Sequence, residues 1–313
     1  MKISLRKVLL ALSSVGLLLS AGVIIGININ FSRLSPVFIV TENAYTLEKS
    51  AEGQLVEDNF WRFARASYIL IGNPPDCEFY KIVSQVPRHD YDVDSFYIDD
   101  ESSCMYYHDG LGQRQSKLAI DVSSHQSAID WEAVKDAGVS VAMIRVGYRG
   151  YGTGVIVKDE SFDMHISGAL DAGLDVGVYF FSQAVNHDEG VEEARYVLNI
   201  IENYDISSPV VIDTEYVADE EARTWGLDVD SRTDAVTGFC DTVKAAGYEA
   251  MIYSNRNWYA QSLDMTRLGD YRLWVAQYGN QPDFPYKFDG WQYTESGELD
   301  GVNGNVDINV WLE

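Results

Sequence analysis

The sequence predicts an α/β fold over residues 118–313, a TIM-like barrel of alternating strands and helices in which the last third has few helices. The first observation behind this fold class is that apolar segments alternate with helical segments from residue 118 onwards. That alternation is typical of parallel strands joined by right-handed crossovers. The second is that the apolar segments follow one another more closely after residue 255, with little helix between them. An open doubly wound sheet is the alternative, but it normally carries a phosphate-binding loop.

The apolar segments number about eight, as a closed barrel requires. The expected strands are 118–122, 141–148, 175–182, 209–216, 249–255, 272–278, 288–294 and 306–311. The expected helices are 129–138, 160–173, 188–204 and 231–247. Three of these helices end in a glycine that suits a left-handed C-cap, namely Gly138, Gly173 and Gly247.

A glycine-rich segment, "GYRGYGTG" at 147–154, is the nearest candidate for a nucleotide-binding loop. It follows a strand, but it lacks the G-x-G-x-x-G order and the Lys-Ser or Lys-Thr of a phosphate loop, so a surface loop is expected. The five histidines are scattered along the chain, and no metal-binding motif occurs. The sequence therefore predicts no cofactor and no metal.

The chain is strongly acidic, with a formal net charge of -25 and a pI near 4.4. Nucleic-acid binding needs a basic surface that displaces counterions from phosphates, so nucleic-acid partners are excluded. The same charge argues against electrostatic docking on anionic lipid.

The N-terminus resembles a membrane anchor. Lys2, Arg6 and Lys7 precede an uncharged stretch, 8–27, which has the length of about 20 residues that a transmembrane helix needs. The cations on one side predict an N-terminus in the cytoplasm and the rest of the chain outside the cell. The alternative is a cleaved signal peptide and a secreted protein, because Ser20 and Gly22 provide a small-x-small cleavage site.

The chain is thus expected to divide into a cytoplasmic tip and transmembrane helix (1–30), an extracellular stalk or accessory region (31–117) and the barrel (118–313). Cys77 and Cys104 both lie in the middle segment, where an oxidising exterior would allow a disulfide. Cys240 falls on the apolar pattern of a helix and is expected to be an inert core residue.

The segment "PVVIDTEY" at 209–216 carries the most informative chemistry. Its continuous β-branched residues are typical of a buried parallel strand, and the strand ends in Asp213 and Glu215. Side chains at i and i+2 of a strand point to the same side, so the two carboxylates lie together while Thr214 points away. Mutual repulsion is expected to raise the pKa of one of them.

Catalytic residues of β/α barrels lie at the carboxyl ends of the strands, and the expected ends bring polar and aromatic residues together. Aromatic rings, carboxylates and amides are what a sugar site needs, because a pyranose has apolar faces and hydroxyl groups. The strand-end residues are Asp121, Arg145, Tyr179, Asp213, Glu215, Tyr253, Trp274, Gln277, Tyr278, Trp291, Gln292 and Asp307.

Residues 118–313 resemble glycoside hydrolase family 25, the lysozymes that cleave peptidoglycan between N-acetylmuramic acid and N-acetylglucosamine. The resemblance rests on "AIDVSSHQ", "IDWEAVKDAGVSVAMIRVGYRGY", "GLDVGVYFFSQA", "VVIDTEY", "LWVAQY" and "WQYTESGELDGVNGNVDIN", which occur in the family's order. It implies a β-1,4 muramidase whose partner is the glycan strand, and it implies nothing for residues 1–117 or for the oligomeric state.

The resemblance also implies roles for the four acids. Glu215 is similar to the family's general acid, Asp213 to the residue that stabilises positive charge at the sugar, and Asp121 and Asp307 to two further acids of the cleft. Asp121 and Asp307 could instead have structural roles, as a loop cap and in fixing the final turn. Retaining, inverting and substrate-assisted mechanisms all stay open from the residues, with the substrate-assisted route favoured. A non-catalytic glycan-binding barrel and a glycosidase for another N-acetylated polymer, such as chitin, are the alternative functions.

Overall fold

The computed structural model describes residues 3–4, 61–73 and 76–312, which divide into two compact units between Val83 and Ser84. The apolar stretch 8–27 lies outside the described residues, as do most residues of the expected stalk. None of the helices within the described ranges is both long enough and apolar enough to cross a bilayer.

The first unit is a small antiparallel sheet with a helical segment over 61–67. Strand β2 (Tyr68–Asn73) pairs with β3 (Asp76–Lys81), which also pairs with the short β1 (Ile3–Ser4). Trp61 stacks on Phe79 at a ring distance of 6.4 Å, and Cys77 is buried beside them. Cys104 is buried in the second unit, and within the described residues the structure forms no disulfide between the two cysteines.

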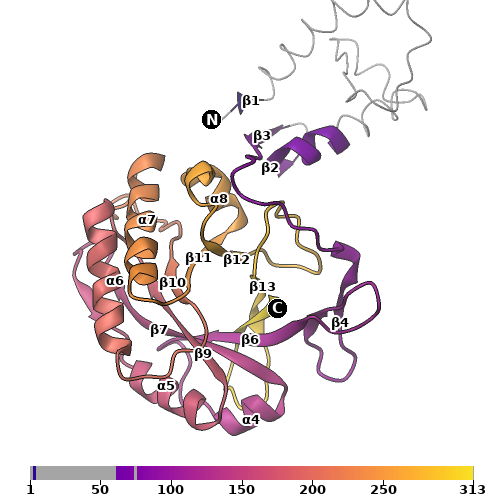
Figure 1. Cartoon of the computed structure of the whole chain (residues 1–313), viewed down its shortest axis with the longest axis vertical. Helices are drawn as coiled ribbons and strands as arrows, with labels where there is room; N and C mark the ends of the chain where they lie inside the picture. Colours follow the sequence, from indigo (N-terminus) through magenta and orange to yellow (C-terminus); the bar gives the residue numbers. More distant parts are fainter. Residues whose placement is uncertain (1–2, 5–60, 74–75, 313) are drawn as a thin grey trace, which may run out of the picture. The chain divides into compact units, whose positions relative to one another are not determined.

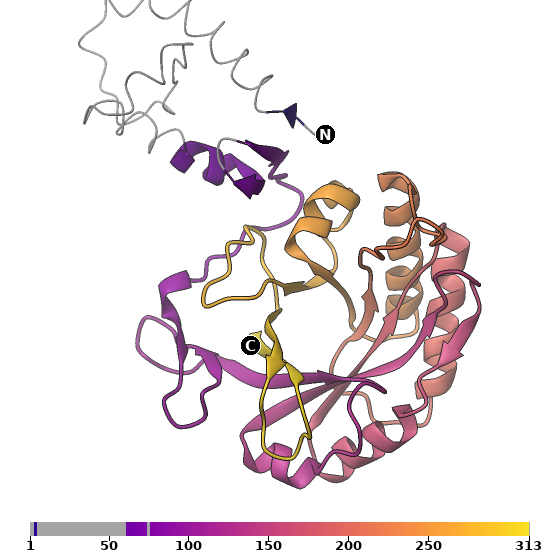
Figure 2. The ribbon, with the colours of Figure 1, turned by 180° about the vertical axis from the view of Figure 1, so that it is seen from behind.

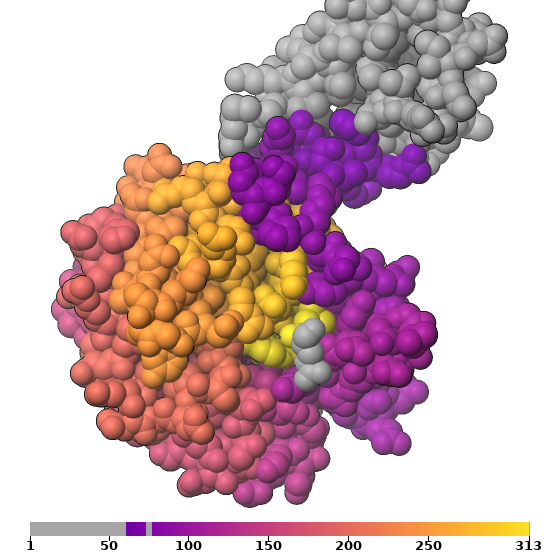
Figure 3. All heavy atoms as spheres, viewed as in Figure 1, coloured from indigo at the N-terminus to yellow at the C-terminus, as the bar shows by residue number. Residues whose placement is uncertain are grey.

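The second unit is a closed barrel of eight strands, which confirms the predicted fold class (Figures 1 and 2). The barrel strands are β6 (Ser116–Val122), β7 (Val139–Arg149), β9 (Asp175–Phe181), β10 (Val210–Asp213), β11 (Ala250–Asn255), β12 (Arg272–Ala276), β13 (Gly290–Gly297) and β14 (Val306–Leu312). β14 closes the barrel by pairing with both β13 and β6. Figure 3 shows yellow C-terminal residues at the surface next to purple residues from the start of the second unit.

Strand β14 does not run in the same direction as the other barrel strands, as it would in a fully parallel barrel. It runs antiparallel to both neighbours, whereas the other barrel strands pair in parallel. Asp307 therefore lies at the amino end of its strand, not at the carboxyl end that the sequence pattern led us to expect. It still reaches the mouth of the barrel, because the antiparallel register pairs it with Asp121 at the end of β6.

Helices cover only part of the barrel, as predicted (Figure 2). The helices are α4 (Trp131–Asp136), α5 (Phe162–Asp171), α6 (His187–Ile201), α7 (Val229–Ala245) and α8 (Arg256–Ser262). The 3₁₀ turn η3 (Met265–Arg267) precedes β12, and no α-helix follows α8 in the described part of the chain. The glycines expected as C-caps, Gly138, Gly173 and Gly247, all have positive φ, between 74° and 97°.

The first three residues of "GYRGYGTG" end β7, and the other five lie in the turn between β7 and the outer strand β8 (Ile156–Lys158). Its backbone is closed by hydrogen bonds from the Gly150 amide to the Val155 carbonyl (2.9 Å) and from the Gly154 amide to the Gly150 carbonyl (2.7 Å). These amides are used within the turn, in agreement with the prediction of a surface loop.

Residues 84–117 belong to the same compact unit as the barrel, although the sequence pattern placed the start of the barrel domain at 118. They contain the 3₁₀ turn η2 (Val93–Ser95) and the hairpin of β4 (Phe96–Ile98) and β5 (Met105–Tyr107), and β6 itself begins at Ser116. The Phe96 ring packs edge-on against Trp291 at 5.0 Å, and the Met105 amide donates to the Tyr293 hydroxyl. Within the described residues, this segment therefore packs against β13, and its strand β5 also contacts β6 and β14.

The interior of the barrel changes from apolar to polar toward the mouth. Ala119, Met143, Val211 and Met251 form part of one buried cluster inside the barrel, together with Trp274 and Trp311. Ala119, Met143, Val211 and Met251 lie on β6, β7, β10 and β11. Since alternate residues of a strand face the same side, the residue two positions further along each of these four strands also faces inward. These next residues are Asp121, Arg145, Asp213 and Tyr253.

Two glycines make room for the large side chains in this interior. A Cβ atom on Gly177 would lie 2.6 Å from the Met143 sulfur, and one on Gly290 would lie 2.8 Å from both the Trp274 and Trp311 rings. The barrel interior is thus filled by side chains, as in other β/α barrels. The polar residues of the mouth lie next to this buried apolar cluster.

Candidate active site

Asp121 is the most strongly hydrogen-bonded carboxylate of the mouth. It is buried, and its Oδ2 accepts from Asn309 Nδ2 at 2.8 Å and from Gln292 Nε2 at 3.0 Å. Burial raises its pKa, while the hydrogen bonds from Asn309, Gln292 and Asp307 oppose that rise. Asp121 is therefore the member of the acid cluster best prepared to carry a negative charge.

Asp307 faces Asp121 across the strand pair β14 and β6 and is the proton donor of this pair. Burial, the charge of Asp121 and the hydrogen bond to Asp121 raise the pKa of Asp307 to about 9. At neutral pH Asp307 is thus protonated and donates to Asp121, so the two carboxyls share one proton.

Asp213 ends β10 and is buried. Burial and the charges of Glu215 and Asp121 raise its pKa well above the usual value, and only the nearby Arg145 lowers it. Its backbone is fixed, because its carbonyl accepts from the Ser182 amide at 2.8 Å. Its side chain is not fully satisfied: Oδ1 is buried and has no hydrogen-bond partner among the described residues. An unpaired buried acceptor is costly unless a ligand donates to it.

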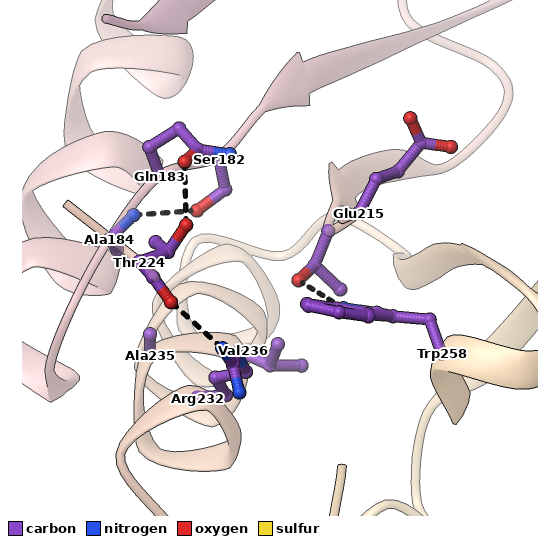
Figure 4. A pocket seen from close by; sticks show the side chains of 10 residues that line it. Ser182, Gln183, Ala184, Glu215, Thr224, Arg232, Ala235, Val236 and Trp258 are labelled. Carbon is purple, nitrogen blue, oxygen red and sulfur yellow. Dashed lines mark hydrogen bonds between the residues drawn. The ribbon is translucent and has the colours of Figure 1, made fainter. Parts of the chain in front are cut away.

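Glu215 lies just beyond the strand, where Thr214 anchors the chain on both sides. The Thr214 amide donates to the Tyr253 carbonyl at 3.1 Å, and the Thr214 carbonyl accepts from Ser254 Oγ at 2.6 Å. The Thr214 hydroxyl accepts from Trp258 Nε1 at 3.3 Å. Figure 4 shows the carboxyl group of Glu215 pointing away from Trp258 and Arg232. The sequence expectation that Thr214 and Glu215 face opposite ways is met.

The pKa of Glu215 is raised to about 7, first by burial and then by the charge of Asp121, with a smaller contribution from Glu295. A hydrogen bond with the Tyr253 hydroxyl lowers it. A carboxyl group with this pKa is half protonated near neutral pH, which is the requirement for a general acid and a general base in one residue.

Gln292 joins the acids to the tyrosines of the mouth. Its side chain is buried, donates to Asp121 and, at 3.4 Å, to Asp307, and accepts from the Tyr253 hydroxyl at 2.8 Å and the Tyr278 hydroxyl at 3.2 Å. Tyr278 remains exposed at the rim. Gln292 therefore orients the site, while Tyr278 is accessible to a ligand.

Arg145 and Tyr179 also belong to this constellation. Arg145 Nε pairs with Asp159 at 2.7 Å and Nη2 donates to Ser124 Oγ at 2.9 Å, so much of its charge is balanced away from the acids. Tyr179 packs edge-on against Trp274, and burial together with the charge of Asp121 raises the pKa of its hydroxyl, which stays protonated.

Three of the expected binding residues do not present a side chain to the mouth. Trp274 is buried inside the barrel, where its Nε1 donates to Asn309 Oδ1 at 2.8 Å. Trp291 is buried under Phe96, and its Nε1 donates to the Gln277 carbonyl at 2.7 Å. The amide of Gln277 exchanges two hydrogen bonds with Asp283 in its own loop. A position near a strand end is therefore not enough to place a side chain in the mouth, because the direction in which it faces and its burial decide access.

Two residues of the site were missed. Asn309 lies two positions after Asp307 and so shares its face, a signal that the strand pattern contained. Glu295 acts on the pKa values of Glu215, Asp307 and Tyr278, but it lies in the irregular half of β13, where a register shift makes facing unpredictable. Among the described residues, no group of three potential ligands is arranged to hold a metal ion.

The chain has relatives of known family. The sequence profile of glycosyl hydrolases family 25 matches residues 120–302, more than half of the chain. The chain belongs to this family. It is 29% identical over 195 residues to the autolytic lysozyme of Clostridium acetobutylicum, covering 62% of this chain and 55% of that protein. It is also 29% identical over 213 residues to lysozyme M1 of Streptomyces globisporus, covering 61% and 66% of the two chains.

A solved structure gives the same picture. The modular autolysin LytC of Streptococcus pneumoniae in complex with a synthetic peptidoglycan ligand superimposes with a TM-score of 0.56 at 26% identity, over 79% of this chain and 61% of that one. The family 25 chain described here thus spans little more than half the length of the autolytic lysozyme that it matches.

Proposed function

We propose that this family 25 protein is a peptidoglycan muramidase that cleaves the β-1,4 bond between N-acetylmuramic acid and N-acetylglucosamine. The observation that carries the proposal is the pair at the end of β10, where Glu215 has a pKa of about 7 beside the buried Asp213. Glycoside hydrolysis requires a pair of carboxyl groups, one of which keeps a proton near neutral pH, and the raised pKa of Glu215 meets this requirement. The lysozyme and autolysin relatives support the choice of substrate.

In the first step, Glu215 donates its proton to the glycosidic oxygen as the bond from that oxygen to the anomeric carbon breaks. The carbonyl oxygen of the substrate's own N-acetyl group bonds to the anomeric carbon from the other face, which gives an oxazolinium ion. The unpaired Oδ1 of Asp213 supports this substrate-assisted route, because the acetamido N–H can donate to it. The positive charge that develops favours the ionised form of Asp213.

In the second step, the Glu215 carboxylate takes a proton from a water molecule that attacks the anomeric carbon. The bond between the anomeric carbon and the acetyl oxygen then breaks, and the N-acetyl group is restored. Glu215 is again protonated for the next cycle, as a pKa near 7 permits.

The remaining acids hold charge and shape. Asp121 and Asp307 share one proton and are tied to Gln292, so this pair adds one negative charge to the cleft rather than two. That charge favours a cationic sugar and keeps Glu215 protonated. Tyr179, Tyr253 and Tyr278 surround the acids with rings and hydroxyl groups suited to a pyranose.

Mass spectrometry of the fragments released from purified peptidoglycan tests this function. A muramidase leaves N-acetylmuramic acid at the new reducing end. Glucosamine at that end would identify a glucosaminidase instead, cleavage of chitin oligomers alone would identify another substrate, and binding without cleavage would identify a glycan-binding barrel. A Glu215→Gln preparation controls for contaminating hydrolases.

We also propose that residues 8–27 anchor the enzyme in the cell membrane with the barrel outside the cell. Support comes from Lys2, Arg6 and Lys7 before the uncharged stretch, since cations remain on the cytoplasmic side. The barrel should then sediment with membranes and be removed by protease added to intact spheroplasts. Full protection from protease would reverse the orientation, and a shortened protein in the medium would identify a cleaved signal peptide.

A further inference from the structure

A cluster of aromatic side chains lies immediately beside the proposed general acid. Tyr216 follows Glu215 in the chain and is 55% exposed, and Trp225, in the loop between β10 and α7, is 44% exposed. The Tyr216 ring lies 5.8 Å from Trp225 and 6.0 Å from Trp258. Trp225 is the most exposed tryptophan among the described residues, and together with Tyr216 it forms a contiguous exposed aromatic patch, a feature that marks binding surfaces.

These three rings border a groove of about 350 Å³, which is lined also by Thr224, Gly226 and Arg232. The volume lies within the range typical of small-ligand sites. A smaller cavity, drawn in Figure 4, shares Thr224, Arg232 and Trp258 with this groove. The groove is large enough for a small ligand, and three aromatic rings line it.

The floor of the groove is held rigidly. Trp258 donates to the Thr214 hydroxyl on one side and lies under the Arg232 guanidinium at 4.8 Å on the other. Arg232 in turn donates through Nη2 to the Thr224 carbonyl at 2.8 Å and through Nη1 to the Leu227 carbonyl. The loop that carries Trp225 is therefore fixed to the same arginine as the floor, so the groove is preorganised for a ligand.

The chemistry of the groove favours a sugar over an acidic peptide. Both terminal nitrogens of Arg232 are used by backbone carbonyls, so this lining cation offers little to a carboxylate. The rings instead provide flat apolar surfaces with polar rims, which suit the apolar face and the hydroxyl groups of a pyranose.

We propose that Tyr216, Trp225 and Trp258 form a carbohydrate-binding subsite for a sugar of the glycan strand next to the sugars at the cleaved bond. The proposal rests on the muramidase function, because a polymer bound at Glu215 continues over the surface beside it. The subsite holds a ring that does not react, so its binding energy selects long glycan strands over short ones.

The test uses the full-length protein and peptide-free glycan chains of alternating N-acetylglucosamine and N-acetylmuramic acid, in a series of lengths. Trp225→Ala should raise KM for long chains roughly tenfold, the usual scale for truncating an aromatic anchor, and leave kcat and the shortest cleaved oligomer nearly unchanged. Trp225→Tyr should recover much of the affinity. Leu111→Ala, at an 84% exposed site, is the control for removing an exposed apolar side chain.

Binding measured by calorimetry in Glu215→Gln protein separates the subsite from catalysis. Loss of long-chain affinity in Trp225→Ala, with the unfolding temperature unchanged, supports the subsite even if the wild-type protein cleaves no peptidoglycan. If Trp225→Ala does not fold, Tyr216→Ala is measured in its place. Equal KM and affinity for Trp225→Ala and Leu111→Ala would overturn the proposal. A loss confined to peptide-bearing fragments would overturn the sugar assignment and identify a stem-peptide site.

Discussion

Glu193 and Glu215 are two glutamates of the same unit whose pKa values are both raised to about 7, yet their surroundings differ. Glu193, on α6, is fully buried and accepts from Arg149 Nε at 2.7 Å and from Ser182 Oγ at 2.6 Å. Glu215 is half-buried at the mouth, and the charges that act on it are those of other acids. A raised pKa therefore does not identify a catalytic residue; the available partners do.

The two sites are nevertheless connected through one residue. Ser182 donates its hydroxyl to Glu193 and its amide to the Asp213 carbonyl. The buried cluster of Arg149, Glu193 and Ser182 thus holds the strand end on which Asp213 stands. The polar groups of this cluster all have protein partners, including Glu192 and two backbone carbonyls for Arg149. In contrast, Asp213 keeps an oxygen without a partner among the described residues, and Glu215 faces other acids. The structural cluster is complete in itself, and the proposed catalytic cluster is completed by a substrate.

The largest effect is expected from Glu215→Gln. The amide keeps the shape of the side chain but has no acidic proton, so hydrolysis of peptidoglycan should fall by about a hundredfold to ten-thousandfold while glycan binding is retained. Reducing-end release and calorimetry measure the two. Activity close to wild type would show that Glu215 is not the general acid, and Glu215 and Glu193 would then no longer differ in function.

Asp213→Asn should also be severe, by roughly a hundredfold or more, because an amide cannot balance the charge of an oxazolinium ion. The two variants are distinguished by a glycoside with a nitrophenyl leaving group that the cleft accepts. Such a leaving group needs little protonation, so the first step should recover in Glu215→Gln and not in Asp213→Asn. Equal deficits on that substrate would contradict the separate roles.

A matched pair of alanine variants tests the structural side of the comparison. Glu193→Ala removes the acceptor of two buried donors and leaves Arg149 with less compensation, which should cost about 3 kcal/mol in the free energy of unfolding. Glu215→Ala relieves repulsion among acids at pH 8 and should leave the unfolding temperature unchanged or higher. Thermal denaturation measures both. A lower unfolding temperature for Glu215→Ala than for Glu193→Ala would reverse the interpretation.

The pH profile of kcat/KM provides a smaller effect. Glu215 must be protonated to act as an acid, and its pKa is raised to about 7, so activity is retained below that pH and lost above it. We expect a decrease of about tenfold per pH unit on the alkaline side. Glu193→Gln should keep this limb, because Glu193 does not touch the substrate. Asp121→Asn should move the limb to lower pH, because the charge of Asp121 raises the pKa of Glu215. A limb that moves in Glu193→Gln and not in Asp121→Asn would show that it reports the ionisation of Glu193 and not that of Glu215.

The sequence predicted the fold class and the acids of the mouth, because alternation of strand and helix and the two-residue repeat of a strand are local properties. Asp121, Asp213 and Glu215 were found in this way. The antiparallel direction of β14 was not, because it depends on how the last strand closes the barrel. The burial of Trp274 and Trp291 was also missed. Trp274 fits beside Gly290 and Trp291 is covered by Phe96, and each of these neighbours is distant in the sequence from the tryptophan that it contacts. The cluster around Glu193 was missed because its members lie in three separate parts of the chain, namely β7, the residue after β9, and α6.

The smallest effect is expected from shortening the chain to the second unit. Removal of residues 1–83 should leave activity and unfolding temperature on soluble substrates nearly unchanged, because the barrel and its covering segment form one compact unit from Ser84. Removal of 1–115 is the contrasting variant. It exposes Trp291 by deleting Phe96, and it deletes Tyr91, whose hydroxyl donates to the Phe288 carbonyl at 2.7 Å. This longer deletion should lower the unfolding temperature, although the cluster around Glu193 and the acids around Glu215 both remain in the shortened protein. Equal stability of the two shortened proteins would show that residues 84–115 are dispensable to the barrel, as the sequence pattern implied.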